Sequence, residues 1–127
     1  MRWRSSSRED GLVQMTHLFA GVAVSDFSVA CEWYERLFDG PPASLPREGE
    51  AVWHLAPSVS IYIRADRGRA GHGLLTIAVK DLEHQRVELA RRGLAVEDGA
   101  EASGLRTVVV EDPDGGRIKF FEDPVKA

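Results

Sequence analysis

Hydrophobic and polar positions follow the same order twice along the chain. From His17 and again from His72, an apolar run rich in β-branched residues leads to an Asp, and an apolar stripe with helical spacing follows it. These residues, Asp26 and Asp81, stand at matching places in the two copies. An Asp side chain at such a place accepts a hydrogen bond from an unpaired N–H group of the first helical turn. Each copy therefore predicts a strand, an Asp N-cap and a helix.

The two predicted helices differ in how apolar their buried stripe is. In the first, apolar residues recur every three or four positions over residues 27–38, and Gly40 is expected to end the helix. In the second, the stripe over residues 82–90 is thinner, and Gly93 supplies the left-handed residue that commonly ends a helix. We expect the second helix to be the more exposed of the two.

Short strands follow each helix. In the first copy they include AVWHL and VSIYIR; in the second they are LAVED, RTVVVED and RIKFFE, and PDGG joins the last two as a tight turn. Each half is therefore predicted to be β-α-β-β-β, and the fold class is α+β. We expect one domain over residues 16–127, made of modules at 16–66 and 71–123, and a disordered tail over the polar residues 1–15.

Composition and charge exclude several classes of function. The 127 residues include 16 Lys and Arg against 20 Asp and Glu, a net charge of -4, with no basic run of the kind that binds phosphates. No apolar stretch approaches the roughly 20 residues of a membrane span, and the N-terminus lacks a signal-peptide core. We therefore expect a cytoplasmic protein without a nucleic-acid or membrane partner. The single cysteine, Cys31, lies on the apolar stripe of the first helix and is expected to pack rather than react.

The repeated pattern resembles the vicinal oxygen chelate superfamily, which includes glyoxalase I, extradiol dioxygenases and bleomycin resistance proteins. The resemblance is carried by AVSDFSVACEWYERLFDG in the first copy and by EDPDGGRIKFFE at the end of the second. It implies two modules that form a curled mixed sheet around a shared cavity, with the helices outside. It also implies a homodimer.

The resemblance further points to four positions at which enzymes of the superfamily bind a metal ion. One lies on the first strand of each module, seven residues before the capping Asp, and one lies on the last strand of each module. Here these positions hold Phe19, Tyr62, Leu74 and Lys119. An ammonium group and apolar or phenolic side chains do not form the oxygen and imidazole ligand set of such an ion. We therefore expect no metal, no cofactor and no catalytic residue of the family's usual kind.

Two histidines leave an enzymatic alternative open. His17 and His72 stand two residues before Phe19 and Leu74, and strand residues two apart point to the same face of a sheet. Both imidazoles could therefore face the cavity, to hold a displaced metal or to transfer protons in a lyase, isomerase or dioxygenase.

Strand alternation predicts what lines the cavity instead of metal ligands. Of the neighbours Trp53 and His54, which face opposite ways, we expect Trp53 to line the cavity. Aromatic side chains would stack on a planar ligand, and Lys119 would meet an anionic group on it. The expected ligand-binding set is His17, Phe19, Trp53, Ser60, Tyr62, His72, Leu74, Thr76, Lys119 and Phe121.

This mixed apolar, aromatic and polar lining is typical of a site for a small organic molecule. The function that the sequence predicts is metal-independent binding of such a molecule, such as the sequestration of a drug or metabolite in antibiotic resistance. Two alternatives remain: an enzyme of the same superfamily that uses His17 and His72, and an accessory module with no small ligand.

Overall fold

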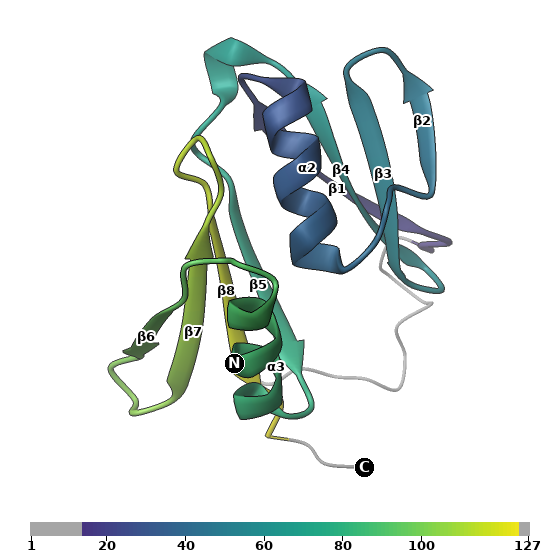
Figure 1. Ribbon diagram of the computed structural model, residues 1–127. Helices are drawn as coiled ribbons and strands as arrows, with labels where there is room; N and C mark the ends of the chain where they lie inside the picture. Colours follow the sequence, from purple (N-terminus) through teal and green to yellow (C-terminus); the bar gives the residue numbers. More distant parts are fainter. Residues whose placement is uncertain (1–13, 125–127) are drawn as a thin grey trace.

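The computed structural model describes residues 14–124, so nearly all of the expected tail lies outside the described residues. The chain runs as a strand, a helix and three strands, twice (Figure 1). The first module consists of β1 (Leu18–Val24), α2 (Phe27–Phe38), β2 (Ser44–Arg47), β3 (Glu50–Ala56) and β4 (Val59–Ala65). A 3-10 turn, Arg67–Arg69, connects the two modules. The second module consists of β5 (Leu74–Val79), α3 (Leu82–Arg91), β6 (Glu97–Ala100), β7 (Arg106–Glu111) and β8 (Arg117–Glu122).

Each module folds into one mixed four-stranded sheet. The strand orders are β1-β4-β3-β2 and β5-β8-β7-β6. In each sheet the first and last strands of the module pair in parallel, and the other neighbours are antiparallel. The predicted α+β class with two βαβββ modules is therefore confirmed. Strand β2 is the strand of the first module for which the sequence pattern gave no segment; its shortness and its Pro46 suit a strand at a sheet edge.

Both helices begin at the predicted Asp caps. The side chain of Asp26 accepts from the backbone N–H of Val29 at 3.2 Å, and that of Asp81 accepts from His84 at 3.0 Å. The first helix ends one residue earlier than expected, because Asp39 rather than Gly40 takes the left-handed conformation, with φ 61°. Asp tolerates this conformation better than most residues because its short side chain can hydrogen-bond locally.

The helix-covered faces of both sheets contribute to one hydrophobic core. Its fully buried members come from both helices and from strands of both modules: Val24, Ala30, Tyr34, Ala51, Ile63, Leu89, Val108, Val110 and Ile118. Since the core takes one face of each sheet, the other face points away from it. The helices therefore cover one face of each sheet, as the expected arrangement with the helices outside requires.

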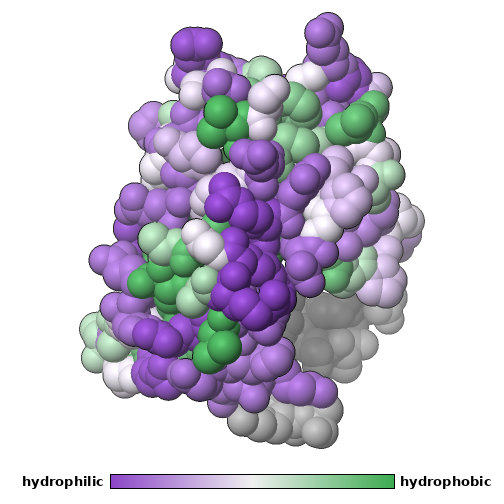
Figure 2. Space-filling view, viewed as in Figure 1, coloured by the Kyte–Doolittle hydropathy of each residue, from purple (hydrophilic) through white to green (hydrophobic). Residues whose placement is uncertain are grey.

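We call the two outward faces the open faces. The first open face carries His17, which directly precedes β1, with Phe19, Gly21, His54, Ser60 and Tyr62; the second carries Leu74, Thr76, Lys119 and Phe121. The helix-bearing side of the molecule is mainly hydrophilic and has only small hydrophobic patches (Figure 2). Neither helix among the described residues has the length and apolar composition that a membrane span requires.

The β7–β8 turn joins the second module to the first. Its Asp112 is buried, and one carboxylate oxygen accepts from the backbone N–H groups of Asp114 at 2.9 Å and Gly116 at 2.7 Å. The other oxygen accepts from the hydroxyl of Tyr34 in α2 at 2.8 Å. Asp114 in turn accepts hydrogen bonds from the backbone and hydroxyl of Ser25. The PDGG turn predicted from the sequence is therefore also the main polar contact between the modules.

Burial and the neighbouring Asp112 carboxylate raise the pKa of Tyr34 well above the usual tyrosine range. A phenol with a raised pKa keeps its proton over the whole physiological range. Tyr34 therefore remains a hydrogen-bond donor to Asp112, and the contact between the modules does not depend on pH near neutrality.

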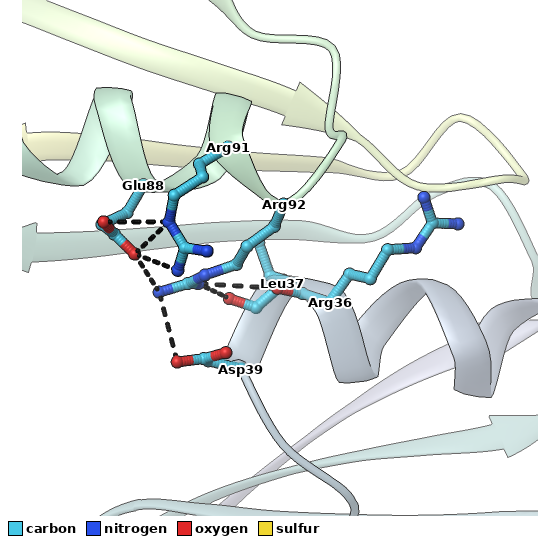
Figure 3. Close-up of polar contacts among 6 residues, drawn as sticks. All are labelled: Arg36, Leu37, Asp39, Glu88, Arg91 and Arg92. Atoms are coloured by element: carbon cyan, nitrogen blue, oxygen red, sulfur yellow. Dashed lines mark hydrogen bonds and ion pairs between the residues drawn. The ribbon is translucent and has the colours of Figure 1, made fainter.

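Arg92 forms a second contact between the modules, at the ends of the two helices (Figure 3). Its Nη1 donates to the carbonyl oxygen of Leu37 at 2.9 Å. Its Nη2 lies 3.8 Å from a carboxylate oxygen of Asp39 and 3.6 Å from one of Glu88. The carbonyl groups at a helix C-terminus carry partial negative charge, so the guanidinium stabilises the end of α2 and links it to the end of α3.

Candidate functional site

Three strands of the first module bring His17, His54 and Ser60 together on the first open face. In the sheet register, Ser60 of β4 lies opposite Phe19 of β1 on one side and opposite His54 of β3 on the other. Side chains two positions apart along a strand share a face, so His17 lies beside Phe19. The sequence placed His17, Phe19 and Ser60 on this face correctly, and it missed His54.

The hydroxyl of Ser60 lies between two imidazole rings. Its Oγ is 2.7 Å from Nε2 of His17 and 2.6 Å from Nδ1 of His54. Ser60 is fully buried, whereas His54 is exposed. The ring of His17 stacks on Phe19, with ring centroids 4.4 Å apart. Two groups that can donate or accept a proton therefore meet at one buried hydroxyl, next to an exposed aromatic ring.

Tyr62 lines a pocket of about 190 Å³ further along the first open face. A Cβ atom at Gly21 would collide with the phenol ring, so the absence of a side chain there lets Tyr62 lie flat against β1. The guanidinium of Arg64 lies over the ring, 5.7 Å from its centroid. It also pairs with the buried carboxylate of Glu50 at 3.3 Å. Both faces of the ring are thus partly covered, and the exposed remainder is available to a ligand.

The second open face carries a separate pocket of about 300 Å³. Its lining includes Leu74 and Lys119, as predicted, and also residues of β6 and β7. Leu74 is 70% exposed, and Thr76 on the same strand is exposed as well. Neither this pocket nor the one beside Tyr62 has a lining residue from the other module. The predicted ligand-binding residues therefore form two groups, one on each open face.

Carboxylates neutralise the basic groups of the second pocket. Nζ of Lys119 lies 2.9 Å from a carboxylate oxygen of Glu101, and Arg117 pairs with Glu111 at 2.9 Å. Glu97, Asp98 and Glu101 line the pocket together with Arg117 and Lys119. An anionic group on a ligand would have to compete with Glu101 for Lys119, so the described residues of this pocket do not supply the free cation that the sequence suggested.

Two predicted site residues do not lie where the sequence placed them: Trp53 is away from the open faces, and His72 is away from His17. Trp53 is only 4% exposed and lies under α2, where its Nε1 donates to the carbonyl of Gly40 at 3.0 Å. The expectation that Trp53, and not His54, lines the ligand site is corrected by this orientation. His72 is exposed in the second module and does not contact His17, whose ring nitrogen is bound to Ser60.

The described residues do not fit the metal ion that the superfamily commonly uses. The four family positions hold Phe19, Tyr62, Leu74 and Lys119, and the Nζ of the last is ion-paired. Within residues 14–124 there is no group of three or more His, Cys, Asp or Glu side chains that could hold a metal ion. His17 and His54 converge on Ser60 as only two such ligands.

Cys31 fits the expectation of a packing residue. It is partly buried on α2, and burial followed by the nearby Glu35 carboxylate raises the pKa of its thiol. A raised pKa lowers the fraction of thiolate, which is the reactive form. Cys31 therefore has no feature of a nucleophile.

Comparison with known families and structures identifies the type of fold. The family model described as Glyoxalase/Bleomycin resistance protein/Dioxygenase superfamily matches residues 14–120. A solved glyoxalase/bleomycin resistance protein from Catenulispora acidiphila DSM 44928 is 40% identical, with 85% of this chain and 98% of that chain covered and a TM-score of 0.79. No curated protein sequence matches this chain.

More distant structures share the fold alone. A bleomycin resistance determinant encoded on the transposon Tn5 is 15% identical and has a TM-score of 0.68, with 86% of this chain and 98% of that chain covered. An antibiotic binding protein from Streptomyces sp. CB03234 is 19% identical and has a TM-score of 0.67, with 88% and 97% covered.

Proposed function

This chain belongs to the glyoxalase/bleomycin resistance protein/dioxygenase superfamily, and we propose on that premise that it binds a small organic molecule on its open faces without a metal ion. One observation carries the proposal. All four positions at which the superfamily's enzymes would bind a metal hold other side chains, and Tyr62, Leu74 and Lys119 among them line pockets on the open faces. An exposed aromatic ring, Phe19, stands beside the first of these pockets and offers a stacking surface to a planar ligand.

The named functions of two structural neighbours support a role in small-molecule binding. One is a bleomycin resistance determinant and another is an antibiotic binding protein. Both share this fold at low identity, so they support a class of function rather than a ligand. We propose a role in binding a drug or metabolite in the cytoplasm.

We further propose that the protein acts as a homodimer in which the sheet edges at β1 and β5 pack against a second copy and the rest of each open face stays accessible. Phe19 is 55% exposed and Leu74 70% exposed, on strands β1 and β5, each of which is an edge of its sheet. Exposed apolar side chains on a sheet edge favour association. Sedimentation velocity is expected to give a dimer, and Leu74→Glu is expected to shift it toward monomer because the interface would then bury a charge. A monomeric wild-type protein would contradict this assembly.

Ligand binding is tested by thermal unfolding in the presence of candidate compounds. We expect bleomycin, a planar anthracycline or benzoate to raise the free energy of unfolding by about 2.7 kcal/mol when present at a hundred times its dissociation constant. The shift is expected to be the same in EDTA, because no metal takes part. Phe19→Ala is expected to weaken binding about tenfold through loss of stacking.

Leu45→Ala is the matched control for Phe19→Ala. Leu45 is a similarly exposed apolar residue, but it lies on the short edge strand β2 away from both pockets. The Leu45→Ala variant is expected to bind the same compounds with the affinity of the wild type. Loss of the shift in EDTA would overturn metal independence, and the absence of any shift in a folded protein would favour the accessory-module alternative.

A further inference from the structure

The contact between His17, Ser60 and His54 restricts which ring nitrogens of the two histidines can carry a proton. Ser60 is fully buried, and the two ring nitrogens lie 2.7 and 2.6 Å from its oxygen. A serine hydroxyl has one hydrogen to donate and two lone pairs that accept. It can therefore donate to only one of the two imidazoles, and the other imidazole must donate to it.

This constraint couples the tautomers of the two histidines. If Ser60 donates to Nδ1 of His54, then His17 donates its Nε2–H, and both rings carry their proton on Nε2. If Ser60 donates to Nε2 of His17, then His54 donates its Nδ1–H, and both rings carry it on Nδ1. Mixed tautomers leave a buried hydrogen without an acceptor, or make two acceptors compete for one hydrogen, which costs about 1–3 kcal/mol.

We infer that His54, Ser60 and His17 form a proton relay, in which His17 acts as general base or acid toward a planar ligand on the first open face. The two ends of the relay are suited to these tasks. Nδ1 of His17 has no hydrogen-bond partner among residues 14–124, and its ring stacks on the exposed Phe19. His54 is exposed and can exchange its proton with water.

The proton balance of the relay is complete. In the first state, Nδ1 of His17 takes a proton from the ligand, its Nε2–H passes to Ser60, and the hydroxyl hydrogen of Ser60 passes to Nδ1 of His54. His54 then releases its Nε2 proton to water, which leaves the second state. The net result is transfer of one proton from ligand to solvent, and the reverse sequence supplies one. The ligand class is therefore a planar molecule with a removable C–H, O–H or N–H proton.

Other polar or charged groups on this face do not take the place of the relay. Glu50, Tyr62 and Arg64 lie two or four register positions further along the strands. Glu50 is occupied by Arg47 at 3.0 Å and by Arg64 at 3.3 Å. The relay is the nearest proton-transfer group to Phe19.

The tautomers are tested by long-range imidazole ¹⁵N NMR on the full chain at pH 8.5, where imidazoles are ordinarily neutral. The wild type is expected to show matched tautomers for His17 and His54. Ser60→Ala is expected to uncouple them, and Ser60→Thr, which keeps the hydroxyl, is expected to restore the match. Mixed tautomers in the wild type, or matched ones in Ser60→Ala, would overturn the relay.

The base is tested with 5-nitrobenzisoxazole, a planar probe that needs no cofactor. Removal of its C–H proton breaks the N–O bond, forms a nitrile and releases a coloured phenolate. The wild type is expected to exceed His17→Ala by about tenfold or more, with Ser60→Ala in between. Equal rates in the wild type and His17→Ala would show that His17 does not act as the general base.

This inference rests on the proposed binding role of the first open face, but the two can fail separately. A protein that is stabilised by aromatic antibiotics and yet shows mixed tautomers keeps the binding function and loses the relay. A protein with matched tautomers and no ligand-induced shift keeps the relay geometry and loses the proposed function.

Discussion

Asp112→Ala is expected to lower the free energy of unfolding by about 3–5 kcal/mol. The substitution leaves the Tyr34 hydroxyl and the backbone N–H groups of Asp114 and Gly116 without the carboxylate that they donate to. Asp112 is 4% exposed, so water does not easily replace these bonds. Urea unfolding followed by circular dichroism measures the effect, and a loss of this size is a large part of the stability of a domain of this length.

Glu111→Ala provides the matched control for this substitution. Glu111 is the neighbouring carboxylate in the chain, but it is exposed and, among residues 14–124, pairs with the half-exposed Arg117 at 2.9 Å. Its removal is expected to change stability by less than about 1 kcal/mol. Similar losses for the two variants would show that the buried contact between the modules contributes little.

Trp53→Ala is also expected to cost about 3–5 kcal/mol of stability, because it opens a large cavity in the core. Trp53 packs against Phe38, with ring centroids 5.5 Å apart, and against Tyr34 at 6.2 Å. Thermal and urea unfolding measure the loss. At temperatures where the variant is folded, ligand affinity is expected to be unchanged, because Trp53 faces away from both pockets.

Leu55→Ala is the control on the same strand. Leu55 lies two residues after Trp53 on β3 but is 39% exposed, so truncation is expected to cost less than about 1 kcal/mol. A Trp53→Ala variant that remained as stable as the wild type but lost ligand binding would restore the sequence-based expectation that Trp53 lines the site.

The strands, the helices and their caps follow from short-range signals in the sequence. Asp26 and Asp81 indicate where the helices begin, because the hydrogen bond from the backbone to the capping side chain spans only three residues. Alternation along β1 and β5 correctly puts Phe19 and Leu74 on the faces away from the core. These features depend on neighbours in the chain, which a single sequence displays directly.

The site depends on relations that a single sequence does not display. Alternation shows that Trp53 and His54 face opposite ways, but only the register of β3 against β4, with His54 opposite Ser60, decides which one faces outward. Likewise, the pairing of Lys119 with Glu101 depends on the position of the loop after β6, which has no periodic pattern. Without that position, the sequence did not indicate that an acidic residue of the same module, Glu101, neutralises Lys119 in that pocket.

The Tyr34–Asp112 contact also affects when the first module can complete its folding during synthesis. Its two partners are 78 residues apart in sequence, and the turn that carries Asp112 joins the last two strands of the second module. A nascent chain that has completed only its first module therefore lacks the acceptor for Tyr34 and the carboxylate that binds Ser25. Contacts between distant residues form late and slow the folding of a domain. The buried phenol of the first module consequently gains its hydrogen-bond acceptor only after β7 of the second module has been synthesised.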